Sequence, residues 1–299
     1  MSTLDTNTHF AAIEPIVQKN FGLEKKTERQ FSKVFDVSKG KEAVRYSIER
    51  GGPATLGLKT ENGAVQQYTI RAGSRKSWLY ALYAGQMTMS VELARDNRVR
   101  EIETCAREMG RATTETPEYL ASQFLDRAFN SSYPATADSV ELCSTAHLIV
   151  GTNASTGQNE LSTPAALSEE SLEDVLTALR AMKYSDGNIR PYDAKGLIVP
   201  SALYTIATKL SRSEKTLGSA NNDPSVVKGI KVLPMDRMEQ TAYWFVKTDA
   251  MNGLFWEWDA EATFQEDNSI TTLQKVYVAW FRARWGCDDW RGIYGSAMT

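Results

Sequence analysis

Asp288 and Asp289 follow directly after Cys287, and they come nearest in this sequence to a catalytic cluster. Neighbouring carboxylates can act as general acid and general base when their surroundings separate their pKa values. With His147 as a base, they would suit a carboxylate-dependent hydrolase. Adjacent carboxylates on a turn are usually solvated, however, and a histidine before an apolar strand usually has a structural role. We therefore predict no enzymatic activity and no catalytic residues, and we keep the hydrolase as an alternative.

Other reactive groups are sparse. The sequence contains no phosphate-binding loop motif, no dinucleotide-binding glycine pattern, no HExxH and no GxSxG. Its three cysteines, Cys105, Cys143 and Cys287, are widely spaced without a CxxC pair, so they indicate neither a disulfide framework nor a zinc site. His9 and His147 are the only histidines, too few for most transition-metal sites. We predict no cofactor and no metal.

Composition sets broad limits on the class of protein. The 299 residues, 42% of them hydrophobic and 24% charged, are those of an ordinary globular protein. A net charge of −3 argues against a protein that coats nucleic acid along its whole length. The sequence shows neither a run of about 18 apolar residues nor a basic start followed by an apolar stretch. We therefore expect a protein that is made and kept in a cytoplasm.

The N-terminal region is basic within an acidic chain. Residues 19–50 carry nine Lys or Arg against five Asp or Glu, a local net charge of +4. Such a segment is either a solvated helix face or an arm that lies against a polyanion or an acidic neighbour. Both interpretations stay open.

Residues 43–77 predict a long hairpin. Apolar residues alternate with polar ones on both arms, as in strands: Val44, Tyr46, Ile48, Tyr68 and Ile70. Asn62 and Gly63 suit the positive φ angles of a tight turn between the arms. An isolated hairpin is marginally stable in water, so this one should rest on something else, such as another subunit.

A long helical element is expected from Val91 onward. Its first part has a face of Val99, Ile102, Ala106 and Met109 and is interrupted at Gly110. Thr116 is predicted to cap a second part, with Pro117 in its first turn and a buried face of Leu120, Phe124 and Ala128. The element should therefore be broken in the middle.

Residues 138–240 predict a mixed unit of strands and helices. Strands are expected at 146–150, 196–200 and 229–234, with another at 241–247. One helix should begin after Ser168, with a stripe of Leu172, Val175, Leu176, Leu179 and Met182. A second spans 201–210, with Leu203, Ile206, Ala207 and Leu210 on its buried face.

The last two strands should pair through opposite charges. Residues 252–270 carry five acids and no Lys or Arg, whereas the final strand carries Arg282, Arg284 and Arg291. Three tryptophans, Trp280, Trp285 and Trp290, could form a platform for single-stranded nucleic acid. A strand with Val276, Val278, Trp280 and Phe281 in the core and arginines on its wet face is the favoured interpretation.

The order of these elements resembles a tailed-bacteriophage major capsid protein of the Hong Kong 97 type, the HK97 fold. Three segments resemble most closely the head proteins of Mu-like phages: LCSTAHLIVGT, NELSTPAALSEESLEDVLTALRAMKYSDGNIRP and GLIVPSALYTIATKLSRS. The similarity in motif covers residues 141–213, and the similarity in element order covers nearly the whole chain, up to the closing WRGIYGS.

The resemblance implies an α+β fold with an N-terminal arm (1–42), an extended loop (43–78) and a peripheral domain (79–137) with a spine helix at 91–129. It also implies an axial domain (138–240) and a return to the peripheral domain through long strands (241–299). Members of the family often begin with a helical scaffolding segment of roughly a hundred residues, for which the sequence before these elements leaves no room.

The resemblance implies a structural subunit of the virion that is assembled in the host cytoplasm. Pentamers and hexamers of the chain would form an icosahedral shell around double-stranded DNA, with scaffolding, portal and decoration proteins as further partners and no membrane. An encapsulin-like nanocompartment, which encloses an enzyme, is the alternative. The expected contacts between subunits are made by Lys25, Lys26, Arg29, Lys59, Arg282 and Arg284.

Overall fold

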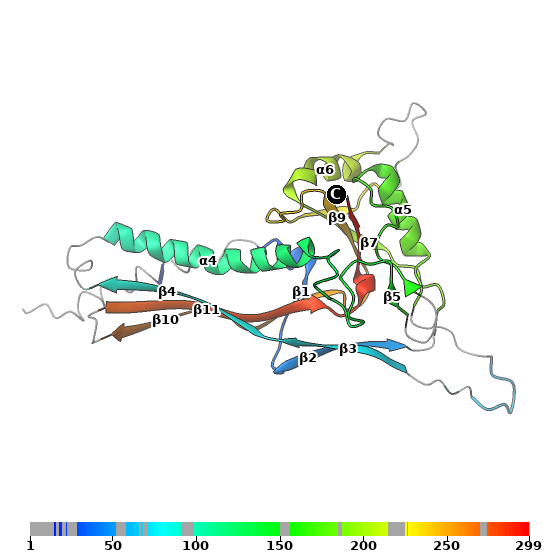
Figure 1. The fold of residues 1–299 in the computed structure, drawn as a ribbon, viewed down its shortest axis with the longest axis horizontal. Coiled ribbons are helices and arrows are strands. Elements are labelled where there is room, and N and C mark those ends of the chain that lie inside the picture. The colour runs from blue at the N-terminus through cyan, green and yellow to red at the C-terminus, as the bar shows by residue number, and fades with distance from the viewer. Residues whose placement is uncertain are drawn as a thin grey trace, which may run out of the picture.

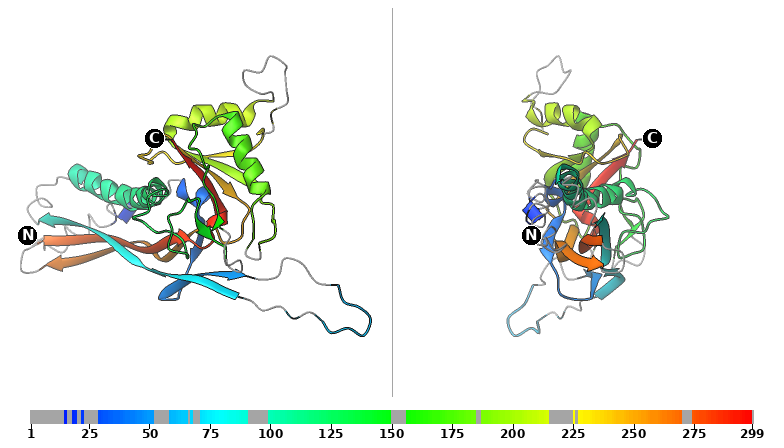
Figure 2. Two further views of the ribbon diagram at one scale, coloured as in Figure 1. Left: turned by 45° about the vertical axis from the view of Figure 1, so that its right-hand side comes forward. Right: turned by 90° about the vertical axis from the view of Figure 1, so that its left-hand side faces the viewer.

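The computed structural model describes residues 29–51, 58–65, 71–90, 99–149, 156–184, 187–214, 227–269 and 274–298, with a few single residues between them. Figure 1 shows a long sheet beneath one long helix, and a smaller sheet with two helices near the C-terminal end of that helix. A hairpin runs under the junction of these two halves and points away from both (Figure 2).

The long sheet has the strand order β1-β10-β11-β4. It consists of β1 (Asp36–Lys39), β10 (Leu254–Ser269), β11 (Gln274–Cys287) and β4 (Ala81–Ser90). β10 and β11 pair antiparallel with two register shifts near residues 258–263, and β1 joins in parallel. Helices α2 (Phe31–Val34) and α4 (Val99–Asp126) cover one face of this sheet. Phe31 packs on Trp256 at 4.6 Å between ring centroids, in the centre of this core.

Helix α4 is continuous over 28 residues, so the predicted break at Gly110 and the predicted cap at Thr116 are wrong. The Thr116 hydroxyl does not cap a helix; it donates to the Ala112 carbonyl at 2.7 Å within α4. Pro117 lies inside the helix and is buried. Local breakers are overridden here because the helix buries one whole face on the sheet, and tertiary packing supplies most helix stability.

Strand β11 has the opposite phase from the prediction. Tyr277, Ala279 and Phe281 are buried on the face toward α4, whereas Val278 and Trp280 are only half-buried on the other face. The prediction of a core position was right for Phe281 and wrong for Val276, Val278 and Trp280, all three of which are half-buried. Successive strand residues point to opposite faces, so a strand that is apolar on both faces does not reveal its phase.

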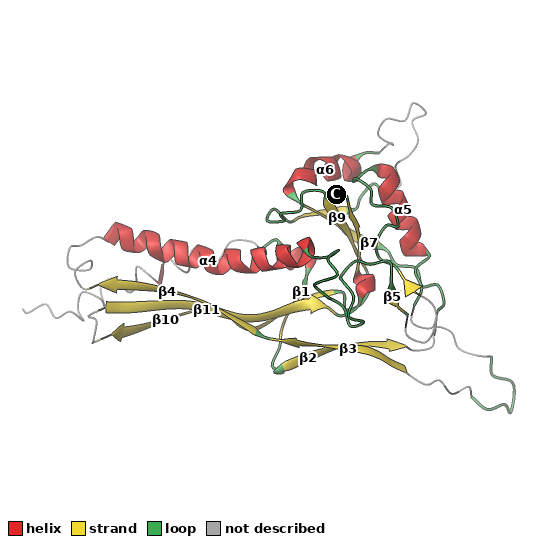
Figure 3. Ribbon diagram, in the orientation of Figure 1, coloured by secondary structure: helices red, strands yellow, loops and turns green. Residues whose placement is uncertain are grey.

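The predicted hairpin is confirmed in its described residues. β2 (Val44–Gly51) pairs antiparallel with β3 (Arg71–Leu79), and Tyr68 and Ile70 lie outside the described residues. Asn62 has a φ of 63°, and the Gly63 amide donates to the Thr60 carbonyl at 3.0 Å, so a tight turn is present, but of the two positive φ angles predicted only that of Asn62 is found. β3 then passes into β4 across Tyr80, so the hairpin is an extension of the long sheet (Figure 3).

The smaller sheet has the order β12-β9-β7-β8. Its strands are β12 (Ile293–Ala297), β9 (Tyr243–Thr248), β7 (Ala194–Val199) and β8 (Lys231–Pro234). Sequence analysis placed all residues after 240 with the long strands, but β9 and β12 pair inside this sheet. The reason is the chain path: β9 and β12 flank the β10–β11 pair in sequence, so the chain leaves the small sheet and returns to it.

Two helices pack on the smaller sheet, α5 (Glu169–Arg180) and α6 (Tyr204–Arg212), with a short 3-10 turn η1 (Ser201–Leu203) before α6. The cap at Ser168 is confirmed, because its hydroxyl accepts from the Ser171 amide at 3.1 Å. Ile206, predicted on the buried face of α6, is 44% exposed. The other three residues of that predicted face fit the structure: Ala207 and Leu210 are buried and Leu203 packs partly buried against the same core, so only Ile206 was predicted wrongly.

Short elements join the two halves: β5 (His147–Leu148), β6 (Thr156–Gly157) and the 3-10 turn η2 (Trp290–Gly292). β5 is shorter than the buried strand predicted at 146–150, and Leu148 is 52% exposed. Arg291, expected in the last long strand, lies in η2. Among the described helices, none is long and apolar enough to cross a membrane.

Candidate functional site

A buried carboxylate joins the hairpin to the long sheet. Glu257 on β10 accepts hydrogen bonds from Arg284 on β11 at 2.7 Å, from Arg45 on β2 at 2.8 Å and from Tyr80 at 2.9 Å. The side chains of Glu257 and Arg284 are only 6% and 2% exposed. We call these four residues the hairpin clamp, because they connect four chain segments at the base of the hairpin: β2, the link between β3 and β4, β10 and β11.

The strand register explains half of the clamp. Glu257 and Arg284 are directly opposite each other in the β10–β11 pair, where opposite charges stabilise a sheet. This confirms the predicted pairing of acidic and basic strands, which also holds for Asp259 and Arg282 at 3.0 Å. Arg45 comes from a strand of another sheet and shares the same carboxylate.

The clamp changes the acidity of Glu257. Burial disfavours its ionised form, but the hydrogen bonds from Arg284, Arg45 and Tyr80 outweigh this effect and lower the pKa of Glu257 to about 2. The carboxylate is therefore ionised throughout the physiological range. Such a group stabilises the fold as long as its cationic partners stay in place.

A second carboxylate extends the clamp toward the hairpin. Asp288 accepts from Arg45 at 2.5 Å and from the Ser47 hydroxyl, and the Trp78 indole donates to Ser47 at 2.7 Å. The Trp78 ring lies against Gly286, where an added Cβ would come within 2.6 Å of it. Asp288 thus orients the hairpin base instead of facing a substrate.

Asp289 helps to hold β2 in place at a second point, Glu49, through Arg291. The Arg291 guanidinium, 1% exposed, contacts Asp289 at 3.1 Å and Glu49 on β2 at 3.2 Å, and its Nε donates to the Lys183 carbonyl at 3.0 Å. Burial raises the pKa of Glu49, although the positive charge of Arg291 acts in the opposite direction. The hairpin is therefore bound to both halves of the molecule through arginine–carboxylate pairs.

His147 lies in a buried network. Its Nδ1 is 2.9 Å from Asp138, its Nε2 is 3.1 Å from the Asn159 side-chain oxygen, and its ring stacks on Trp290 at 4.7 Å. The Asn159 amide nitrogen faces the carbonyls of Leu142, Trp290 and Ile293, which fixes the orientation of that side chain. Burial opposes ionisation of Asp138, but hydrogen bonds led by that from His147 lower its pKa overall. His147 is thus structural, as predicted.

These positions weaken the hydrolase alternative. Asp288 and Asp289 are both engaged with arginines, and His147 is fully buried in a separate network. Cys287 is also buried, and burial raises the pKa of its thiol well above the ordinary value. No group of three or more metal-binding side chains occurs within the described part of the chain.

For Arg284, the expected role in contacts between subunits is wrong. It was expected on a charged outer face, but it is buried because Glu257 lies opposite to it and Tyr80 covers its guanidinium at 4.1 Å. Arg282 is the exposed arginine of this strand; its side chain is 46% exposed and pairs with Asp259.

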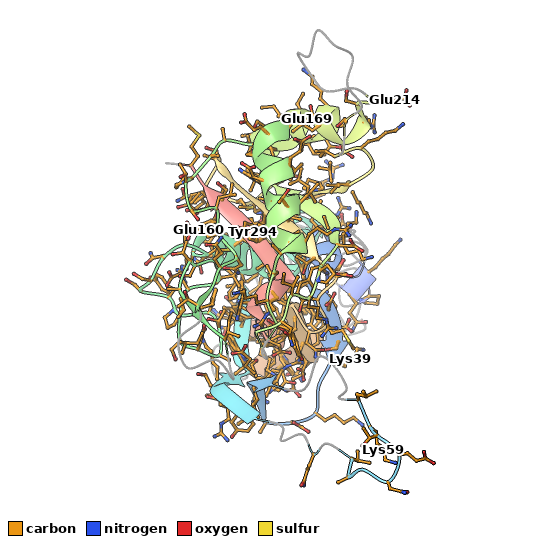
Figure 4. The ribbon with its side chains drawn as sticks, turned by 90° about the vertical axis from the view of Figure 1, so that its right-hand side faces the viewer. Lys39, Lys59, Glu160, Glu169, Glu214 and Tyr294 are labelled. Carbon is orange, nitrogen blue, oxygen red and sulfur yellow. The ribbon has the colours of Figure 1, made fainter. Side chains whose placement is uncertain are left out.

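Of the other expected contact residues, the structure describes two, Arg29 and Lys59. Arg29 stands over the Trp258 ring at 5.2 Å, so it packs partly against its own subunit. Lys59 is exposed near the tip of the hairpin, far from the sheets (Figure 4). Lys25 and Lys26 lie outside the described residues.

Sequence analysis missed Arg45, Glu49 and Glu257 as functional positions. Each lies in a strand with apolar neighbours, and a charged residue in such a strand is a signal for a buried ion pair. The partners were not predictable, because 212 residues separate Arg45 from Glu257.

The chain is similar to known proteins in sequence and in fold. A family model described as phage capsid protein matches residues 82–296. No curated protein matches the sequence. The fold is similar to a virus-like particle from Pyrococcus furiosus, with TM-score 0.55 and 13% identity over 94% of this chain and 98% of that one.

Two phage structures are similar to the same extent. The procapsid protein of bacteriophage JBD30 has TM-score 0.54 and 13% identity, over 97% of this chain and 75% of that one. Mycobacterium phage Patience has TM-score 0.53 and 11% identity, over 98% of this chain and 88% of that one. Identities this low show that the fold is shared and no more.

Proposed function

The chain belongs to the phage capsid protein family and has the Hong Kong 97 fold, and from this premise we propose that it is the major capsid subunit of a tailed double-stranded DNA phage. Pentamers and hexamers of the chain form a closed icosahedral shell. The role needs no catalytic step. Asp288 and Asp289 fit a structural role of this kind, because each carboxylate forms an ion pair with an arginine of the same chain.

The projecting hairpin is the observation that carries the proposal. Leu58 is 95% exposed and Val65 is 75% exposed near its tip, and the hairpin points away from both halves of the molecule (Figure 2). A two-stranded hairpin with exposed apolar residues gains little from its own subunit. A neighbouring copy that covers the tip would bury these residues, and a repeating contact of this kind closes into rings and shells.

The proposed parts follow the family arrangement. In our proposal the arm and the hairpin make contacts between subunits, α4 is the spine helix, and the smaller sheet with α5 and α6 forms the part around the symmetry axes. Strands β9 and β12 belong to that part. The proposed contact residues between copies are Lys25, Lys26, Arg29, Lys59 and Arg282.

Negative-stain electron microscopy with sedimentation of the purified protein tests this function. Uniform hollow polyhedra are the expected result, because closure multiplies many weak contacts. A small monodisperse species that is unchanged by protein concentration, crowding and salt would overturn the proposal.

Cargo distinguishes the phage shell from an encapsulin-like compartment. Particles from infected or expressing cells should contain DNA, held through non-specific contacts with the inner surface, or a portal protein. A co-purified enzyme in place of DNA would indicate the compartment instead. Assembly in the host cytoplasm and the use of scaffolding or decoration proteins are further parts of the proposal.

A further inference from the structure

A cavity of about 590 Å³ lies between the hairpin base and the smaller sheet. Its walls come from β2, from the segment before β7, from the turn after β9 and from the segment that includes η2. The Arg291 pairs with Glu49 and Asp289 form its floor. The cavity therefore lies where the hairpin joins the body, outside the buried hairpin clamp.

The cavity has an excess of negative charge. Four carboxylates line it, those of Glu49, Asp249, Asp288 and Asp289, against two guanidinium groups, those of Arg190 and Arg291. Arg45 pairs with Asp288 from outside the cavity, and Arg291 pairs with Glu49 and Asp289, so Asp249 is the lining carboxylate for which the described residues show no arginine partner. A concave surface with fixed charges of one sign attracts the opposite charge more strongly than a flat one.

Tyr192 is a second and independent feature. This residue is 6% exposed and lines the cavity, and its hydroxyl has no hydrogen-bond partner among the described residues. Burial raises the pKa of Tyr192 to about 12, so the hydroxyl is neutral and is left with an unused donor and acceptor. This hydroxyl is not one of the buried side-chain atoms without a partner, so it is accessible at the cavity and can accept a hydrogen bond from a ligand there.

The rim indicates how large the ligand is. Met251 is 79% exposed and Tyr46 is 49% exposed, and both line the cavity. An anionic centre with large apolar residues at its edge suits a protein surface that inserts one cationic side chain and covers the rim. A small cation would leave the rim residues in water.

We infer that this cavity receives a lysine or arginine side chain of a second copy of the chain. The inference rests on the proposed function, since it requires contacts between copies. The inserted cation neutralises part of the charge of Asp249 and Asp289 and brings a donor to the Tyr192 hydroxyl. It also attaches the neighbouring copy at the base of the hairpin. The contact proposed above for the hairpin tip lies at the opposite end of the hairpin.

Asp249 is the residue that tests the inference. It is exposed, and its main structural contact is the hydrogen bond that its Oδ1 accepts from the Asp193 amide at 2.9 Å. Asp249→Asn keeps this acceptor and removes the charge, and Asp249→Lys reverses the charge. Glu108→Lys is the matched control, since Glu108 is exposed on α4, away from the cavity, the hairpin and the smaller sheet.

Assembly yield at matched concentration and salt, measured by sedimentation, is the readout. Asp249→Lys should reduce the yield of closed particles by at least about tenfold, because like charges across an interface repel strongly. Asp249→Asn should give a smaller loss, and Glu108→Lys should assemble like the unchanged chain. Circular dichroism and the melting temperature establish whether each variant folds. If Asp249→Lys does not fold, the assembly yield of Asp249→Asn tests the inference.

Two outcomes separate the inference from the proposed function. Normal shells from Asp249→Lys, or from Asp249→Asn where only that variant folds, overturn the inference and leave the shell function intact. An unchanged chain that forms no shells overturns both. Equal losses for Asp249→Lys and Glu108→Lys also overturn the inference, because the effect would then be one of net charge.

Discussion

Arg45 Nη1 lies 2.8 Å from Glu257 Oε2, although the two residues are 212 positions apart in the chain. The same guanidinium reaches Asp288 through its other nitrogen at 2.5 Å. One arginine of the hairpin is thus shared by Glu257 of the long sheet and by Asp288, which follows β11 directly. This arrangement fixes the direction in which the hairpin leaves the body, which is the property that a subunit with a projecting contact needs.

Glu257→Gln should destabilise the folded subunit by about 3–5 kcal/mol, because it leaves the buried Arg284 without its anionic partner. Urea denaturation of the unassembled chain measures the change in the free energy of unfolding. Asp259→Asn is the control; its ion pair with Arg282 is exposed and should cost less than about 1 kcal/mol. Equal effects of the two substitutions would show that the clamp is not a strong interaction.

The stability of the subunit should depend on pH through Glu257. Its pKa in the folded state is about 2, against 4.5 for an ordinary glutamate. A lowered pKa means that the folded state binds the proton less readily, so the contribution is complete above pH 4.5 and is lost as the pH falls toward 2. The loss should amount to about 3 kcal/mol over this range. Glu257→Gln should remove that component, and parallel pH curves for the two proteins would refute the assignment.

Asn159→Ala should destabilise the junction of the two halves by about 3 kcal/mol or more, since several buried polar groups lose their partner. Those groups are the Ser144 amide, the His147 ring and three carbonyls, of which the Leu142 and Trp290 carbonyls are nearest at 2.8 and 2.9 Å. Thermal unfolding measures the loss. As a control, Asn130→Ala removes a side chain whose contact with the Ser132 amide is exposed, and it should change stability little. A small effect at Asn159 would mean that water replaces its hydrogen bonds.

Local signals in the sequence were sufficient for many elements. The alternation at Val44 and Ile48 predicted β2, the Asn62 turn was recognised from residue type, and Ser168 marked the start of α5. Each of these features depends on residues within a few positions of one another, where backbone preference and side-chain capping decide the structure.

The wrong predictions have a common physical cause. The phase of β11 was predicted wrongly since Trp280 and Phe281 are equally apolar, and only the placement of α4 decides which one is buried. Arg284 was placed on the surface because its partner depends on the register between two long strands. Pro117 suggested a helix start, yet the sheet beneath α4 keeps the helix intact. In all three cases a distant contact outweighs a local preference.

The hairpin tip should change its protection from hydrogen exchange when copies assemble. Among residues 58–65, the backbone hydrogen bond that the structure describes is the one from the Gly63 amide to the Thr60 carbonyl, and Leu58 is almost completely exposed. In the free subunit these amides should therefore exchange quickly. In closed shells a neighbour should cover the tip, and exchange should slow by about tenfold or more. The base of the hairpin is an internal control: its strands are paired and clamped by Arg45, so its amides should be protected in both forms. Equal fast exchange of the tip in free subunits and in shells would show that it has no partner, and the contact between copies would then have to lie at the cavity beside the base.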